Sequence, residues 1–157
     1  MKKNKPLTIG IADTTFAVVD MARHVLPILS QHNLPVQRYT VPGFKDLPVA
    51  CLKLFREEKC DLVIALGMAG PMPIDKQCAH EASLGLTQVQ LMTQKHIIEV
   101  FVHMDEAKNK KELREIAINR ATKHTLNALA LLNGKSALTP FAGSGRRQGK
   151  SDVGGIP

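Results

Sequence analysis

The chain alternates short, mostly apolar runs with longer stretches in which apolar residues recur every three or four positions. Short apolar runs predict β-strands, and helical spacing predicts amphipathic helices. The predicted strands cover residues 7–12, 36–41, 61–67 and 97–102. The run at 61–67 is almost continuously apolar, which is typical of a parallel strand buried on both faces.

A predicted helix follows each of these strands. The expected buried faces are Val18, Met21, Ala22, Val25 and Ile28 or Leu29 in the first helix; Leu47, Ala50, Cys51, Leu54 and Phe55 in the second; Ala79, Ala82, Leu86 and Val89 in the third, near residues 75–94; and Leu113, Ile116, Ala117, Leu126, Leu129 and Ala130 in the fourth, near residues 109–132. We expect Pro27 to kink or shorten the first helix and Gly134 to end the fourth. Asp46 is the expected N-cap of the second helix, with a proline in its first turn.

Strand and helix alternate through residues 1–133, which predicts a single α/β domain with a four-stranded parallel sheet and helices on both faces. A length of 157 residues with 44% hydrophobic side chains suits one such domain. Residues 134–157 hold six of the eleven glycines and show no sustained period, so we expect a Gly-rich basic tail. Such a tail is either disordered or ordered against a neighbouring subunit.

The positive charge is concentrated at the two ends of the chain. The formal net charge is +7, of which Lys2, Lys3 and Lys5 supply three and the tail another three. The remaining residues are nearly neutral. With one Tyr and no Trp, the chain offers few side chains for stacking on bases, so we expect no nucleic-acid binding.

No apolar run approaches the ~18 residues of a membrane span, and the N-terminus lacks the apolar core of a secretory signal. We therefore expect a cytoplasmic protein that does not bind membranes. The cysteines Cys51, Cys60 and Cys78 lack the spacing of a zinc site. We expect reduced thiols and no metal site.

Ligands of open parallel sheets bind beyond the carboxyl ends of the strands. Polar turns that should meet at this edge are residues 13–16, 42–46, 67–70 and 103–106. The glycines of the third turn would let the backbone approach a ligand closely, although the chain has no phosphate-loop motif.

Four residues in these turns are candidates for ligand contact. Phe16 and Phe44 could sandwich a planar heterocycle, or both could cap the core. Asp46 could accept hydrogen bonds from sugar-like hydroxyls instead of capping a helix, and Lys45 could offer a positive charge.

His103 and the adjacent pair His80 and Glu81 are the candidates for acid/base chemistry, because imidazole titrates near neutral pH. Surface or capping roles are the alternative for each. Cys78, His80 and Glu81 do not have the spacing of a metal site.

Taken together, the turn sequences resemble the archaeal type of riboflavin synthase. The segments that carry the resemblance are residues 13–16, 40–50, 61–67, 78–86 and 95–103, and residues 146–149 add to it. The similarity covers about residues 7–133. Because that family is related to lumazine synthase, the resemblance implies a flavodoxin-like three-layer αβα fold and a homopentamer with active sites between neighbouring subunits.

The resemblance also implies a reaction. Two molecules of 6,7-dimethyl-8-ribityllumazine dismutate, one donating a four-carbon unit to the other, to give riboflavin and 5-amino-6-ribitylaminouracil. No cofactor takes part. The protein would hold two planar ligands face to face and assist removal of a proton from a 7-methyl group.

Carried onto this chain, the resemblance implies substrate contacts by Thr15, Phe16, Gly43, Phe44, Lys45, Asp46, Met68, Ala69, Gly70, Val102 and His103. It places the first two against the ring system and residues 43–46 along the ring and the ribityl chain. The catalytic candidates are His103, Glu81 and Asp46, and which of them moves the proton stays open.

Other functions also stay open. Lumazine synthase shares the topology, but it binds a phosphate through a Gly-Ala-Thr turn followed by a histidine, whereas residues 70–76 read Gly-Pro-Met-Pro-Ile-Asp-Lys. Its Pro-Gly-Ala-Phe-Glu turn also becomes Pro-Gly-Phe-Lys-Asp at residues 42–46. A non-catalytic flavin- or lumazine-binding protein is a further alternative, and a pure assembly or nucleic-acid protein is another.

Overall fold

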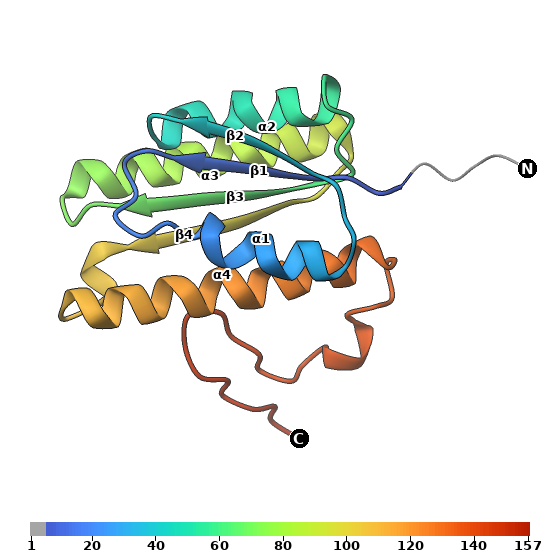
Figure 1. Cartoon of the computed structure of the whole chain (residues 1–157). Helices are drawn as coiled ribbons and strands as arrows, with labels where there is room; N and C mark the ends of the chain where they lie inside the picture. Colours follow the sequence, from blue (N-terminus) through green and yellow to red (C-terminus); the bar gives the residue numbers. More distant parts are fainter. Residues whose placement is uncertain (1–5) are drawn as a thin grey trace, which may run out of the picture.

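A computed structural model of the chain describes residues 6–157, so the predictions that rest on Lys2, Lys3 and Lys5 lie outside the described residues. The described part contains a four-stranded sheet that is parallel throughout, in the order β2-β1-β3-β4 (Figure 1). The strands are β1 (Ile9–Thr14), β2 (Val36–Val41), β3 (Leu62–Ala69) and β4 (Ile97–His103). All predicted strands are present.

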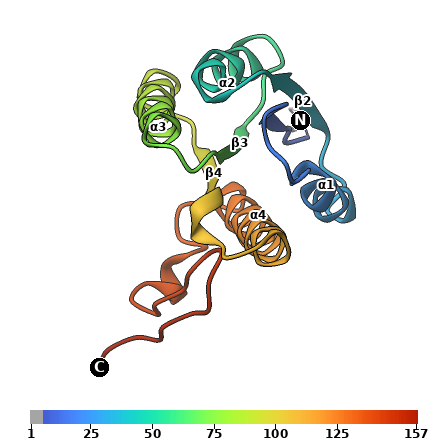
Figure 2. The ribbon, with the colours of Figure 1, turned by 90° about the vertical axis from the view of Figure 1, so that its left-hand side faces the viewer.

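Helices cover both faces of the sheet. They are α1 (Ala22–Gln31), α2 (Leu47–Arg56), α3 (Pro73–Thr93) and α4 (Lys110–Leu132). Figure 2 shows α2 and α3 on one side of the sheet and α1 and α4 on the other. The predicted α/β class, with a parallel sheet between two helical layers, is confirmed. Within residues 6–157, every helix is too short or too polar to span a bilayer.

Successive side chains of each strand point to opposite faces of the sheet, so a hydrophobic core forms on each face. Ile64 and Met68 of β3 pack toward α1 and α4. Val63 and Ala69 of the same strand pack toward α2 and α3. All eight residues of β3 are buried, as expected for a strand between two helical layers. Burial of each large apolar side chain contributes about 1.5–3 kcal/mol, so this strand is a main source of stability.

The predicted buried faces of α2 and α3 are confirmed in full. The prediction for Val18 is wrong, because α1 begins only at Ala22 and leaves Val18 exposed in the preceding loop. Pro27 lies inside α1 without ending it, and the helix continues to Gln31.

The prediction for Leu126 of α4 is also wrong, because this side chain is exposed. The helix instead buries Ala121, Thr125 and Ala128. The Thr125 hydroxyl donates a hydrogen bond to the carbonyl of Ala121 at 2.8 Å, which allows a polar side chain to occupy a core position. Beyond α4, Gly134 adopts the left-handed φ of +120° at which glycine is favoured.

Three strands run further than predicted, and β4 does so by one residue, to His103. β1 extends through Thr14, so Asp13 and Thr14 are buried strand residues and not part of a turn. β3 extends through Ala69, which places Met68 inside the sheet. A single 3-10 turn follows each of the other two ligand-edge segments: η1 (Phe44–Asp46) after β2 and η2 (Met104–Glu106) after β4.

The tail passes through a third 3-10 turn, η3 (Thr139–Phe141), returns to contact α4 near the middle of the helix, and then runs away from it to the C-terminus (Figure 1). The Lys123 ammonium of α4 donates to the carbonyl of Arg147 at 2.9 Å, and the amide of Gly149 donates to Oδ1 of Asn119 at 2.9 Å. The tail is therefore ordered against a helix of its own chain. Neither of the alternatives expected from the sequence included this arrangement.

Candidate active site

A cavity of about 360 Å³ opens at the carboxyl edge of the sheet, beside the ends of β1, β2 and β3. Its lining residues come from the turns after these strands and from the start of α3: Phe16, Pro42, Gly43, Phe44, Lys45, Asp46, Ala69, Gly70, Asp75 and Cys78. The structure thus brings together seven residues that the sequence analysis had singled out, namely Phe16, Gly43, Phe44, Lys45, Asp46, Ala69 and Gly70.

The two aromatic residues of the cavity differ in exposure. Phe16 is 52% exposed, whereas Phe44 is only 8% exposed. The Phe44 ring makes an edge contact with the Phe101 ring, with centroids 4.4 Å apart and planes at 69°. It also lies against Gly67, where a Cβ would collide with it. Phe44 therefore packs in the core behind the cavity, and Phe16 is the ring that a ligand can cover.

Thr15 joins two of the turns and does not line the cavity. Its amide donates to the carbonyl of Val41 at 2.9 Å, and its hydroxyl donates to the carbonyl of Pro42 at 3.3 Å. These bonds hold the turn after β1 against the turn after β2. Thr15 therefore fixes the relative position of Phe16 and Gly43, which follow these hydrogen-bonded residues in the two turns.

Lys45 and Glu81 form an ion pair, with Nζ and Oε2 2.6 Å apart. Gln77 also donates to the Glu81 carboxylate, at 3.0 Å. The hydrogen bond from Lys45 is the main cause of a lowered pKa of Glu81, and the hydrogen bond from Gln77 is the second. The hydrogen bond to Glu81 raises the pKa of Lys45 in turn. Glu81 lies outside the cavity lining, and the lowered pKa makes its carboxylate a weaker base.

Asp46 directly precedes α2 and lines the cavity. The prediction that it caps this helix is wrong, because its side chain makes no capping hydrogen bond. The carboxylate is therefore available to a ligand in the cavity, which was the alternative expectation. Asp75 does act as a cap: its Oδ2 accepts a hydrogen bond from the amide of Met72 at 3.1 Å.

The sequence analysis missed Asp75 and Cys78 as lining residues. Both lie near the start of α3, which follows β3 at the ligand edge. The rule that locates ligands at strand ends applies equally to the helix that begins there. Extending the third candidate turn by two helical turns would have found them.

Met68 and Val102 do not reach the cavity with their side chains. Both side chains are fully buried in the core beneath α1 and α4, on the opposite face of the sheet from Phe44 and Ala69. The reason is strand alternation: residues 68 and 69 of β3 point to opposite faces. The resemblance implied that Met68 lines the pocket and that Val102, with Glu81 and His103, lies near its mouth or is contributed by the adjoining subunit. Within the single chain, only the backbone of Met68 and Val102 is left for a ligand contact.

His103 lies at the end of β4, is half-buried and does not line the cavity. Within the described residues, its Nδ1 is buried without a hydrogen-bond partner. Glu99 lies on the same face of β4, and its carboxylate accepts a hydrogen bond from the Ser83 hydroxyl at 2.8 Å. Burial raises the pKa of Glu99 above its ordinary value. The sequence analysis missed Glu99 because apolar neighbours made it a strand residue.

The catalytic candidates therefore do not converge in one chain. Asp46 lines the cavity, Glu81 pairs with Lys45 outside its lining, and His103 lies on the edge strand β4. Asp13 is committed elsewhere, because its carboxylate accepts hydrogen bonds from Arg38 at 2.5 Å and from Thr40 at 2.6 Å. In residues 6–157, no three His, Cys, Asp or Glu side chains gather closely enough to hold a metal ion.

Comparison with known proteins identifies the family. Residues 6–136 match the model of the 6,7-dimethyl-8-ribityllumazine synthase family. The riboflavin synthase of Methanothermobacter thermautotrophicus is 52% identical over 150 residues, which cover 94% of this chain and 98% of that protein. The riboflavin synthase of Archaeoglobus fulgidus is 46% identical over 151 residues, covering 96% of this chain and 99% of that protein.

The similarity to a protein named lumazine synthase is much narrower. The 6,7-dimethyl-8-ribityllumazine synthase of Desulfovibrio desulfuricans is 33% identical over 96 residues, which cover 55% of this chain and 61% of that protein. The similarity to the riboflavin synthases extends along nearly the whole chain, including most of the tail. The chain therefore belongs to the lumazine synthase family and, within it, to the archaeal riboflavin synthases.

Proposed function

We propose that this chain catalyses the dismutation of two molecules of 6,7-dimethyl-8-ribityllumazine to riboflavin and 5-amino-6-ribitylaminouracil. One molecule donates a four-carbon unit to the other. The two products together contain all the atoms of the two substrates, so the reaction needs no external oxidant, reductant or co-substrate.

The observation that carries the choice between this reaction and lumazine synthesis is the turn between β3 and α3. A helix N-terminus binds phosphate through unpaired backbone N–H groups. Here Pro71 and Pro73 have no N–H, and the N–H of Met72 already donates to the Asp75 carboxylate. The negative charge of Asp75 at this helix end also disfavours an anion. Phosphate-free substrates suit this site better than a sugar phosphate.

The main contribution of the protein would be to hold the two ring systems together. Positioning two reactants in contact can lower a barrier by roughly 7–11 kcal/mol, whereas a positioned general base adds about 10²–10⁴-fold. Phe16, with its exposed ring, would cover one face of a lumazine. Lys45 and Asp46, which also line the cavity, would contact the polar groups of the ring and the ribityl chain.

We further propose that the site is completed between subunits of a homopentamer. The cavity in one chain lacks His103, and β4, which carries it, pairs only with β3 among the described residues. Leu84 and Leu91 lie two helical turns apart on α3, and both are exposed. Exposed apolar side chains in such a stripe support burial against a second copy.

An assay that offers each candidate reaction separately tests the proposal. Purified protein supplied with dimethylribityllumazine alone should form riboflavin. Supplied with 5-amino-6-ribitylaminouracil and 3,4-dihydroxybutanone 4-phosphate, it should form no lumazine. Lumazine formation in the second mixture would identify a lumazine synthase. Tight ligand binding without product in either mixture would identify a binding protein.

A further inference from the structure

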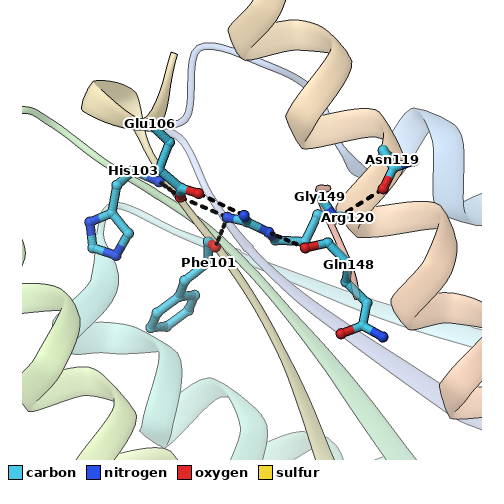
Figure 3. Close-up of polar contacts among 7 residues, drawn as sticks. All are labelled: Phe101, His103, Glu106, Asn119, Arg120, Gln148 and Gly149. Carbon is cyan, nitrogen blue, oxygen red and sulfur yellow. Dashed lines mark hydrogen bonds and ion pairs between the residues drawn. The ribbon is translucent and has the colours of Figure 1, made fainter. Parts of the chain in front are cut away.

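The guanidinium of Arg120 joins three separate parts of the chain (Figure 3). From α4, Nη1 donates to the carbonyl of Phe101 in β4 at 2.9 Å, and Nε donates to the carbonyl of Gln148 in the tail at 3.4 Å. Nη1 and Nη2 also donate to the two carboxylate oxygens of Glu106, each at 2.7 Å. The side chains of Arg120 and Glu106 are 12% and 22% exposed. This is a bidentate and largely desolvated pair, the geometry that fixes direction as well as distance.

Glu106 extends this arrangement to a candidate catalytic residue. Its Oε1, which binds Arg120, also accepts a hydrogen bond from the backbone amide of His103 at 2.9 Å. Figure 3 shows the His103 side chain and the Arg120 guanidinium on either side of this carboxylate. The Arg120 hydrogen bond lowers the pKa of Glu106 to about 2, so the pair is ionised at any pH at which an enzyme assay is run.

The tail holds the other side of the guanidinium. Gly149 donates its amide to Asn119 and adopts a φ of +83°, a left-handed conformation. A Cβ at this residue would lie 2.6 Å from Nε and Nη2 of Arg120, which is shorter than a non-bonded contact allows. Glycine is therefore required at position 149 both by its backbone angle and by the Arg120 side chain.

We infer that Arg120 is a positioning residue for the proposed reaction: through Glu106 it fixes the backbone of His103, and the Gln148–Gly149 segment of the tail holds Arg120 in place. The inference rests on the proposed function only in giving His103 a role in turnover. An arginine is suited to this task because one rigid group serves the strand end, the carboxylate and the tail at once. A misplacement near 1 Å at a reacting group can cost about 10²-fold in rate.

A double-mutant cycle tests this inference. Arg120→Met should lower kcat about tenfold or more with little change in KM, and Arg120→Lys, which keeps the charge, should recover part of the loss. In the His103→Ala background, Arg120→Met should lower kcat no further, because the imidazole that Arg120 positions is absent. An equal loss in both backgrounds would overturn the inference, since it would show an effect independent of His103.

The tail is tested by two glycine variants with the same backbone penalty. The Cβ of Gly149→Ala would collide with Arg120, whereas the Cβ of Gly154→Ala, at a φ of +77°, would have no heavy atom within 4 Å. We expect Gly149→Ala to lower kcat severalfold and Gly154→Ala to leave it near the wild-type value. An equal loss of kcat in the two glycine variants would overturn the role of the tail. Gly149→Ala also tests the inference if Arg120→Met fails to fold.

A readout that needs no activity separates this inference from the proposed function. Hydrogen exchange of the His103 amide, followed by NMR, should be slow in the wild type because Glu106 accepts its hydrogen bond. Arg120→Met and Gly149→Ala should accelerate this exchange, and Gly154→Ala should not. Unchanged exchange in Arg120→Met would contradict the positioning role, whereas a wild-type chain that forms no riboflavin would contradict the proposed function alone.

Discussion

At the scale of single residues, exposure separates ligand contacts from core packing. Phe16 and Phe44 both lie in turns that follow strands, after β1 and after β2, and the sequence does not distinguish them. In the structure, Phe44 packs against Phe101 and Gly67, while Phe16 keeps half of its surface exposed. The packing partners of Phe44 lie in β3 and β4, far along the chain, so no local pattern reveals them.

Replacing Phe16 by alanine should therefore change substrate binding, and replacing Phe44 by alanine should change stability. Phe16→Ala should raise KM for dimethylribityllumazine and leave the melting temperature almost unchanged, because the exposed ring lines the cavity and does not pack in the core. Phe44→Ala should reduce the free energy of unfolding by about 3–5 kcal/mol, the usual cost of removing a buried phenylalanine. Steady-state kinetics and thermal unfolding of both variants provide the measurement, and a large loss of stability in Phe16→Ala would contradict this division.

His103→Ala should lower kcat by no more than the 10²–10⁴-fold that a positioned base contributes. Because the larger positioning term would remain, measurable turnover should persist. The measurement is the pH profile of kcat for the wild type and the variant. If kcat and its profile are the same in both, proton transfer belongs to another residue, and Asp46, which lines the cavity without capping α2, is the next candidate.

The cysteines give a second test at this scale. Burial raises the pKa of Cys51 to about 12, so this thiol should be inert at neutral pH, whereas Cys78 is only half-buried and lines the cavity. A thiol reagent applied to native protein should label Cys78 and not Cys51, and dimethylribityllumazine should slow the labelling. Mass spectrometry of digested protein provides the measurement, with Cys78→Ser as the control. Labelling unaffected by ligand would place the substrate elsewhere.

At the scale of elements, the sequence predicted the strands and helices well and their ends less well. Apolar periodicity found α4, but it assigned Leu126 to the core because threonine was not counted as a core residue. Thr125 occupies that position because its hydroxyl is satisfied within the helix. The same limit applies to β1, where Asp13 continues the strand because Arg38 of β2 compensates its charge and the Thr40 hydroxyl donates it a hydrogen bond.

The exposed face of α3 should determine assembly. Leu84→Glu together with Leu91→Glu places two charges on this face. If the proposed oligomer forms through it, we expect the variant to dissociate and riboflavin formation to fall with dissociation. Sedimentation velocity and the activity assay give the measurement. Ile156→Glu, at an exposed residue of the tail, is the matched control and should change neither. Dissociation with full activity would show that the active site is complete within one chain.

At the scale of the whole molecule, the arrangement of the tail could not be predicted from the sequence. Its contacts join residues such as Arg120 and Gln148, which are 28 positions apart, and a stretch without periodicity gives no indication of its partner. The location of the cavity could be predicted, because the carboxyl edge of a parallel sheet follows from the topology. That His103 lies outside the cavity lining could not be predicted, because periodicity does not give the order of the strands in the sheet.

The pair between Arg120 and Glu106 should make the fold sensitive to acid. The folded pKa of Glu106 is about 2, below its ordinary value of 4.5, so the pair stabilises the fold above the unfolded pKa and this stability is lost as pH falls toward 2. For one group the loss amounts to roughly 3 kcal/mol at most. Urea unfolding at several pH values should show a steeper decline between pH of about 5 and 2 for the wild type than for Glu106→Gln. Parallel curves would contradict the strong pairing.

The central claim is that two identical lumazines react with each other in one site. The direct measurement is the stoichiometry of turnover with dimethylribityllumazine as sole substrate, in which substrate, riboflavin and 5-amino-6-ribitylaminouracil are quantified by chromatography. We predict that two substrate molecules disappear for each riboflavin formed, with one molecule of the uracil released. Riboflavin formed only after a second compound is added, or one lumazine consumed per riboflavin, would contradict the account.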